Sequence, residues 1–249
     1  MKRSIYNVGF LVTGVFVIFI LYFILQSAFN TVLFPTIGEI GTRFLDFFHV
    51  KGLISFGYTL LRLLISLAIS FVVSIGISYL YFLFKPSLMI FKPLMFLLKV
   101  SPIVAIVLYV QVLTASSSML APYVVTTMIM IPLMTEAYVS GINSIDKTIL
   151  DVLKLEGANR SYQFFKIIFP MISENIVLSM FQSIGLGLKV VVMVEYFCFL
   201  KYGIGSMMNT YYTLLDIAGL IATIVFVALI AVILEVVLIV LKKKVFKIA

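Results

Sequence analysis

The sequence predicts an all-α integral membrane protein with about six transmembrane helices. Of its 249 residues, 63% are hydrophobic and only 11% are charged, and the mean hydropathy is +1.23, values outside the range of water-soluble domains. The apolar residues are gathered in runs, and a helix needs only ~20 of them to cross ~30 Å of hydrocarbon. We therefore interpret residues 1–249 as a single transmembrane domain.

Six apolar runs are long enough to span a bilayer: about 8–29, 53–84, 87–113, 119–141, 171–198 and 215–241. The first is too long for the core of a signal peptide and no small-x-small cleavage site follows it, so it is expected to be retained. The second exceeds what a bilayer requires and should tilt or project. The third contains Pro93 and Pro102, which favours a broken or kinked helix.

The distribution of Lys and Arg predicts the orientation. One set of loops and ends holds most of the basic residues: Lys2, Arg3, Lys85, Lys92, Lys147, Lys154, Arg160, Lys166, Lys242, Lys243, Lys244 and Lys247. The other holds Arg43, Lys51 and Lys201. By the positive-inside rule both termini are cytoplasmic. Residues 142–170, which we call the elbow, then form the largest cytoplasmic loop, and residues 36–50 form an outside stretch with a short surface helix.

Residues suited to catalysis or metal binding are scarce. Cys198 is the only cysteine and His49 the only histidine. An intrachain disulfide is therefore excluded, and the residues needed for a metal site or for the active site of a membrane-bound enzyme are too few. The chain also lacks a Gly-x-x-x-x-Gly-Lys-Ser/Thr loop for ATP phosphates. We predict no catalytic residue, no metal and no cofactor in this chain.

The elbow contains two short helical segments. The first ends near Gly157, and the second starts near Ser161 and is expected to end before Pro170. Amphipathic and carrying both charge signs, this helix–glycine–helix segment has the form of a docking surface for a soluble partner.

The elbow resembles the "EAA" loop of permease subunits of bacterial ABC importers, whose pattern is Glu-Ala-Ala, three residues, Gly, nine residues, Ile-x-Leu-Pro. The matching positions, in register, are Asp151, Val152, Leu153, Gly157, Ile167, Phe169 and Pro170. The Ala-Ala pair is replaced by Val152-Leu153, so the docking helix should be bulkier than usual. The coupling residues implied by this resemblance are Asp151, Val152, Leu153, Lys154, Glu156, Gly157, Ala158, Ile167 and Pro170.

The resemblance extends over about residues 55–240. The run from Gly185 to Glu195 followed by Gly203-Ile204-Gly205 is similar to the nitrate/sulfonate/taurine-type branch of these permeases, as are Tyr58-Thr59-Leu60-Leu61-Arg62 and Lys99-Val100-Ser101-Pro102.

A type I importer permease with a cytoplasmic coupling helix is the fold that the resemblance implies. The implied partners are a second permease copy, two cytoplasmic ATPase subunits that bind ATP and Mg, and an extracytoplasmic solute-binding protein, at a bacterial inner membrane. The coupling helix, about 149–156, is expected to transmit closure of the ATPase to the spans. A secondary transporter or channel without ATP coupling is the alternative; it predicts discontinuous helices in matched halves of the chain.

Ionisable residues lie within or near the ends of the apolar runs: Arg62, Lys99, Glu136, Lys189, Glu195 and Glu235. A charge at the bilayer centre costs at least ~2.5 kcal/mol unless it is paired or hydrated, so each needs a partner. For Arg62 and Glu195, a structural ion pair and a substrate contact both remain open.

Lys189 lies in mid-span and is a candidate for the translocation path or a subunit interface; in the path it would suit an anionic solute. Glu136 and Glu235 favour interfacial or interhelical roles. Gly185 and Gly187 form a small-residue patch for close helix packing, or alternatively a gate.

Overall fold

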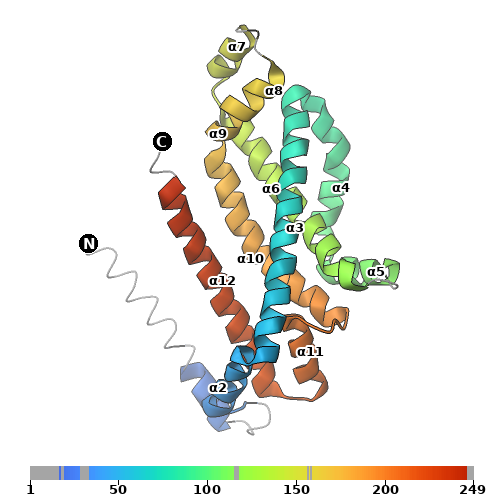
Figure 1. Ribbon diagram of the computed structural model, residues 1–249, viewed down its shortest axis with the longest axis vertical. Coiled ribbons are helices and arrows are strands. Elements are labelled where there is room, and N and C mark those ends of the chain that lie inside the picture. The colour runs from blue at the N-terminus through green and yellow to red at the C-terminus, as the bar shows by residue number, and fades with distance from the viewer. Residues whose placement is uncertain are drawn as a thin grey trace, which may run out of the picture.

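The computed structural model describes residues 17, 20–28, 34–114, 118–155, 157 and 159–245, and all regular structure in these residues is helical (Figure 1). The helices are α2 (Ile37–Leu45), η1 (Asp46–Phe48), α3 (Val50–Leu83), η2 (Lys85–Ser87), α4 (Leu88–Val100), α5 (Ile103–Leu113), η3 (Ser118–Leu120), α6 (Ala121–Ser144), α7 (Lys147–Leu155), α8 (Arg160–Gln163), η4 (Phe164–Ile168), α9 (Phe169–Met171), α10 (Ser173–Phe197), α11 (Ile204–Thr213) and α12 (Ile217–Val245). The predicted all-α class is confirmed.

Four helices in the described residues are long and apolar enough to cross a membrane: α3, α6, α10 and α12. They agree with four predicted runs to within a few residues. Segment 85–100, which comprises η2 and α4, and helix α5 form a bent pair. If this pair is counted as one span, it is the fifth. The first predicted run, 8–29, lies largely outside the described residues, so the expected total of six spans stays a prediction.

The third predicted run is broken, as expected. Segments 85–100 and 103–113 meet at an angle of 106°. Ser101 has an extended backbone (ψ 137°) because Pro102 follows it, and proline disfavours the helical conformation in the residue before it. Pro93, by contrast, lies inside α4 without ending it. In Figure 1, α5 leaves the bundle sideways while α4 runs along α3.

A row of small polar residues lets α3 and α6 pack closely. Four fully buried serines recur every fourth residue of α3, and so share one face: Ser66, Ser70, Ser74 and Ser78. The hydroxyls of the first three lie 3.3 to 3.4 Å from α6 carbonyl oxygens, those of Tyr123, Thr127 and Ile131. Since both rows advance by four residues, the two helices run parallel and in register.

The elbow lies at one end of the bundle, and α2 and α11 lie at the other (Figure 1). A capping box between Thr36 and Glu39 starts α2, and Arg43 forms an ion pair of 2.7 Å with Asp216, just before α12. The predicted surface helix in residues 36–50 is therefore confirmed.

The basic residues divide between the two ends as the sequence predicted. The α2 and α11 end carries Arg43, Lys51 and Lys201, and the elbow end carries Lys85, Lys147, Arg160 and Lys166. Which end faces the cytoplasm stays a prediction from the positive-inside rule.

Candidate functional site

The first helix of the elbow, α7, has one buried face and one exposed apolar face. Leu153 is 5% exposed and packs with Leu150 against the core. Ile149, Val152 and Leu155 recur at a spacing of three, and Leu155 is 86% exposed. An exposed apolar stripe on a short helix marks a surface that is suited to a partner.

One hydrogen bond holds the two segments of the elbow together, and two contacts hold the elbow on the end of α3. The buried Gln163 side chain donates through Nε2 to the Leu153 carbonyl oxygen at 2.6 Å, which links α8 to α7. The hydroxyls of Tyr79 and Ser161 lie 2.7 Å apart. Phe164 is buried, and its ring packs on that of Tyr79 with centroids 5.1 Å apart. The elbow is therefore in direct contact with a spanning helix.

Asp146 starts α7. Its Oδ1 accepts a hydrogen bond from the Thr148 backbone N–H at 2.9 Å, and this bond lowers the pKa of the carboxyl group below its usual value. The ionised side chain satisfies one of the free N–H groups of the first turn.

Gly157 provides the bend of the elbow. Its φ of +64° is left-handed, while a Cβ at this position would meet no atom within 4 Å. The requirement for glycine is therefore conformational and not steric. Lys154 lies in α7, though its side chain is not described, and Glu156 and Ala158 lie outside the described residues.

The second segment of the elbow does not end before Pro170, so that expectation was wrong. Asn159 caps α8 by accepting from the Ser161 N–H at 3.0 Å. The helix then passes through the π-helical turn η4 and continues into α9, with Pro170 in the first turn of α9. The wider turn accommodates a residue that lacks an N–H. Ile167 is partly buried and Pro170 is exposed.

A buried carboxylate joins three helices near the α11 end of the bundle. Glu195 on α10 is fully buried and forms an ion pair of 2.6 Å with Arg62 of α3. It also accepts hydrogen bonds from the Thr59 hydroxyl at 2.8 Å and from the Gly205 N–H at 3.0 Å. We call these four residues the Glu195 cluster. Of the two alternatives for Arg62 and Glu195, the structure has the ion pair.

The Gly203-Ile204-Gly205 turn is shaped by this carboxylate. Gly203 has a φ of +147°, and a Cβ there would overlap the Glu195 carboxyl group. A Cβ on Gly205 would overlap the Val192 carbonyl oxygen. The first N–H groups of α11 thus approach the Glu195 cluster, where a helix N-terminus favours negative charge.

The two glycines of the predicted small-residue patch differ. A Cβ on Gly187 would overlap the Met130 side chain and lie 2.9 Å from Leu63, so close packing of α10 on α6 and α3 explains this residue. A Cβ on Gly185 would meet no atom within 4 Å.

Lys99 and Glu136 pair with each other across α4 and α6. Lys99 Nζ lies 2.7 Å from Glu136 Oε2, and both side chains are about half exposed, at 51% and 52%. The predicted interhelical role of Glu136 is confirmed.

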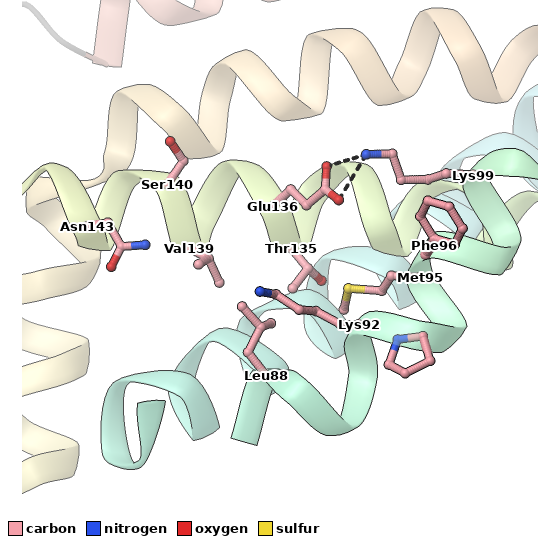
Figure 2. A pocket seen from close by; sticks show the side chains of 11 residues that line it. Leu88, Lys92, Met95, Phe96, Lys99, Thr135, Glu136, Val139, Ser140 and Asn143 are labelled. Atoms are coloured by element: carbon pink, nitrogen blue, oxygen red, sulfur yellow. Dashed lines mark hydrogen bonds and ion pairs between the residues drawn. The ribbon is translucent and has the colours of Figure 1, made fainter. Parts of the chain in front are cut away.

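The pair lines a pocket of about 700 Å³ between α4 and α6, which we call the α4–α6 pocket (Figure 2). The lining residues are Leu88, Lys92, Pro93, Met95, Phe96, Lys99, Thr135, Glu136, Val139, Ser140 and Asn143. In Figure 2 the Lys92 side chain extends from α4 toward α6. Lys92 and Lys99 of α4 thus face polar residues of α6, although both helices are otherwise apolar. These polar residues are Thr135, Glu136, Ser140 and Asn143.

Lys189 lies in a different place. It is exposed in a groove of about 550 Å³ between α10, α11 and α12, where Gly185 also lies. The other lining residues are mostly apolar, such as Leu188, Val192 and Val227. Within the described part of the chain, Lys189 has no ion-pair partner.

The elbow exposes an apolar stripe, the Glu195 cluster joins three helices, and the α4–α6 pocket holds charged side chains between apolar helices. Residues 73–247 match the family described as "Binding-protein-dependent transport system inner membrane component". The chain belongs to this family. It is therefore a multi-pass permease component of an ABC transporter, a class that is generally non-catalytic and implies an ABC ATPase and a binding protein as partners. No curated protein matches the chain.

The sequence does not single out several of the site residues. Lys92 is explained as an ordinary positive-inside charge, and Asn143, Gln163 and Tyr79 are neutral residues that no charge or motif position marks. For Asn143 the spacing does carry a signal. Together with Glu136 and Ser140 it follows the pattern i, i+4 and i+7, which places all three on one face of a transmembrane helix.

Proposed function

We propose that this chain is the permease subunit of an ATP-driven importer. A second copy completes the translocation path, an extracytoplasmic binding protein delivers a small solute, and two cytoplasmic ATPase subunits drive alternating access. The elbow end then faces the cytoplasm of a bacterial cell. Small anions of the nitrate, sulfonate or taurine type are the proposed solutes.

The apolar stripe of α7 is the observation that carries the proposal. Val152 and Leu155 are exposed although the same helix buries Leu153, and a partner that covers the stripe would recover the free energy of removing that apolar surface from water. Gln163 and Tyr79 link this helix to α3, so the load applied by an ATPase would reach a spanning helix.

The α4–α6 pocket supports a role in the path. Lys92, Lys99 and Glu136 would be costly against lipid, and their exposure is explained if the pocket faces water or a second copy of the chain. The Thr135 hydroxyl adds to this, because it is buried at the pocket wall without a hydrogen-bond partner among the described residues. Lys92 has no ion-pair partner among the described residues, and a cation left over beside the Lys99–Glu136 bridge suits an anionic solute.

The Lys189 groove fits that role less well. Its lining is mostly apolar and Lys189 has no ion-pair partner among the described residues, so this surface suits contact with a partner helix better than a polar path. We therefore propose the interface role for Lys189.

The bent pair of α4 and α5 is the one observation that favours a secondary transporter or channel, because discontinuous helices line the sites of such proteins. The described residues contain one such pair, whereas inverted halves predict two. This favours the importer.

A pull-down tests the proposal. The tagged chain is extracted from its native membrane in mild detergent, and the soluble proteins that co-purify are identified by mass spectrometry. We expect a subunit with an ATP-binding phosphate loop at near-equal stoichiometry. Leu155→Asp, which puts a charge on the stripe, should reduce its recovery at least tenfold, as should Gly157→Val, which opposes the left-handed bend.

Lys166→Gln is the matched control, because Lys166 is exposed on the elbow but lies outside α7. Normal recovery with Leu155→Asp, or no ATPase with the unmodified chain, would contradict the docking role and favour the channel.

A further inference from the structure

A second cavity lies behind the elbow, between α7 and the ends of α3 and α6. Its volume is about 240 Å³, enough for several water molecules at ~30 Å³ each. The lining residues are Tyr81, Phe82, Lys85, Ile142, Asn143, Ile145, Lys147, Leu150, Leu153, Arg160 and Gln163. We call it the elbow cavity.

Three cations from separate segments line this cavity, and none of the described residues that line it is a carboxylate. Lys85 begins η2, Lys147 begins α7 and Arg160 begins α8. A lysine at the start of a helix has the unfavourable sign for the helix dipole. At α7, Asp146 offsets part of this unfavourable interaction with the helix dipole through its bond to Thr148. The Asp146 side chain does not line the cavity.

Asn143, a neutral polar residue at the cavity wall, is also available as a donor. The Tyr81 hydroxyl donates to Asn143 Oδ1 at 2.6 Å, which leaves Nδ2 as the donor end of the carboxamide, with no partner among the described residues. Arg160 is positioned by Phe82, whose ring centroid lies 6.0 Å from its guanidinium carbon. A cavity that gathers donors and positive charge is complementary to an oxyanion.

The simpler explanation is that these are ordinary positive-inside charges, each turned toward water or headgroups. That explanation accounts for their side of the membrane. It does not account for the convergence of three segments on one concave space, nor for the lack of a carboxylate among the described lining residues.

We propose that the elbow cavity is an oxyanion-binding site that takes a phosphate-type group and, when occupied, ties α7 to the ends of α3 and α6. The group can come from the phosphodiester headgroup of an anionic lipid or from a free anion such as inorganic phosphate. Because a bound anion would bridge Lys147 of α7 and Lys85 of the segment after α3, occupancy of the cavity would restrain the elbow. This site is separate from the exposed stripe of α7 and does not depend on the ATPase.

Hydrogen exchange of the full-length chain in nanodiscs tests the site. Exchange of residues 147–155 is compared in phosphatidylcholine alone, with inorganic phosphate added, and with phosphatidylglycerol included in the bilayer. We expect slower exchange under at least one of the last two conditions. Protection by inorganic phosphate identifies a free-anion site, and protection by phosphatidylglycerol alone identifies a headgroup site.

The variants make the test specific. Arg160→Gln and Lys85→Gln should each weaken binding about tenfold, measured as the concentration of phosphate or the fraction of phosphatidylglycerol that gives half-maximal protection. Lys166→Gln removes a charge from the same end of the molecule outside the cavity and should leave it unchanged. Two Gln variants are used because Arg160 also packs on Phe82.

Two results would overturn the proposal. One is the absence of protection by both phosphate and phosphatidylglycerol in the unmodified chain. The other is an equal loss of protection in Lys166→Gln and in the two cavity variants, which would mean a diffuse electrostatic effect of the basic surface.

Discussion

Arg62 and Glu195 are 133 positions apart in the sequence, yet their side chains form a buried ion pair, with Nη1 2.6 Å from Oε1. Arg62 Nη1 also donates to the Tyr202 carbonyl oxygen at 2.7 Å. Thus α3 holds both the end of α10 and the turn before α11. A buried carboxylate persists in such a place because charged and neutral donors surround it.

Removing one partner of this pair should be strongly destabilising. Arg62→Met leaves Glu195 buried without its counter-ion, and we expect a loss of about 3–5 kcal/mol. The measurement is thermal unfolding of the detergent-solubilised chain, followed with a thiol-reactive dye at the buried Cys198, the only cysteine. The double variant Arg62→Met/Glu195→Gln should lose less than the sum of the single variants; strict additivity would contradict a direct pair.

Gly205→Ala should destabilise the chain because its Cβ would overlap the Val192 carbonyl oxygen, and we expect a loss of about 2 kcal/mol or more. Gly185→Ala is the control. It lies inside α10, the helix against which Gly205 packs, at a position where a Cβ meets no atom within 4 Å, so alanine should be neutral or stabilising by up to ~1 kcal/mol. Equal unfolding temperatures for the two variants would show that the Glu195 cluster does not constrain the turn.

The sequence was most informative where a physical requirement acts along the chain. Lipid requires continuous apolar helices, so the runs at 53–84, 119–141, 171–198 and 215–241 were predictable. Pro102 predicted the break in the third run, and the glycine at position 157 predicted the bend of the elbow, where φ is +64°.

Pairing across the chain was less predictable. The charges of Lys99 and Glu136 predicted that each residue needs a partner. The local sequence does not indicate that they pair with each other, because the position of Lys99 along α6 depends on how α4 and α5 bend. The expected end before Pro170 failed for a similar reason. A π-helical turn, which single-residue preferences do not signal, carried the helix through the proline.

The serine row of α3 makes a prediction about packing. Ser70→Leu places a large side chain between α3 and α6, where Ser70 is fully buried, and we expect a loss of about 1–3 kcal/mol from overpacking. Val73→Leu, at an exposed position of the same helix, should change the unfolding temperature little. A tolerated Ser70→Leu would mean that the close parallel approach of the two helices is not required for stability.

Asp146 makes α7 sensitive to acid. Its folded-state pKa is lowered by the Thr148 N–H, so the stabilisation is present above the unfolded-state pKa and is lost as the pH falls through the folded-state value. We expect α7 to fray in the acidic range below the ordinary aspartate pKa of ~3.9. Asp146→Ala should show the frayed state already at neutral pH, as faster hydrogen exchange in 147–155. Unchanged exchange in this variant would mean that packing of Leu153 alone holds the helix.

Variants of the Lys99–Glu136 pair can distinguish whether the α4–α6 pocket is filled with water or with lipid. Both side chains are about half exposed. If the α4–α6 pocket is wet, Glu136→Gln should cost only ~0–1 kcal/mol, because exposed pairs contribute little in water. If lipid fills it, the unpaired Lys99 should cost ~2.5 kcal/mol or more. Thermal unfolding in nanodiscs measures the difference, with Lys99→Gln as the reciprocal variant. We expect the small loss for both, accompanied by reduced uptake in vesicles reconstituted with the partner subunits. A large loss of stability would exclude the pocket from the water-filled path.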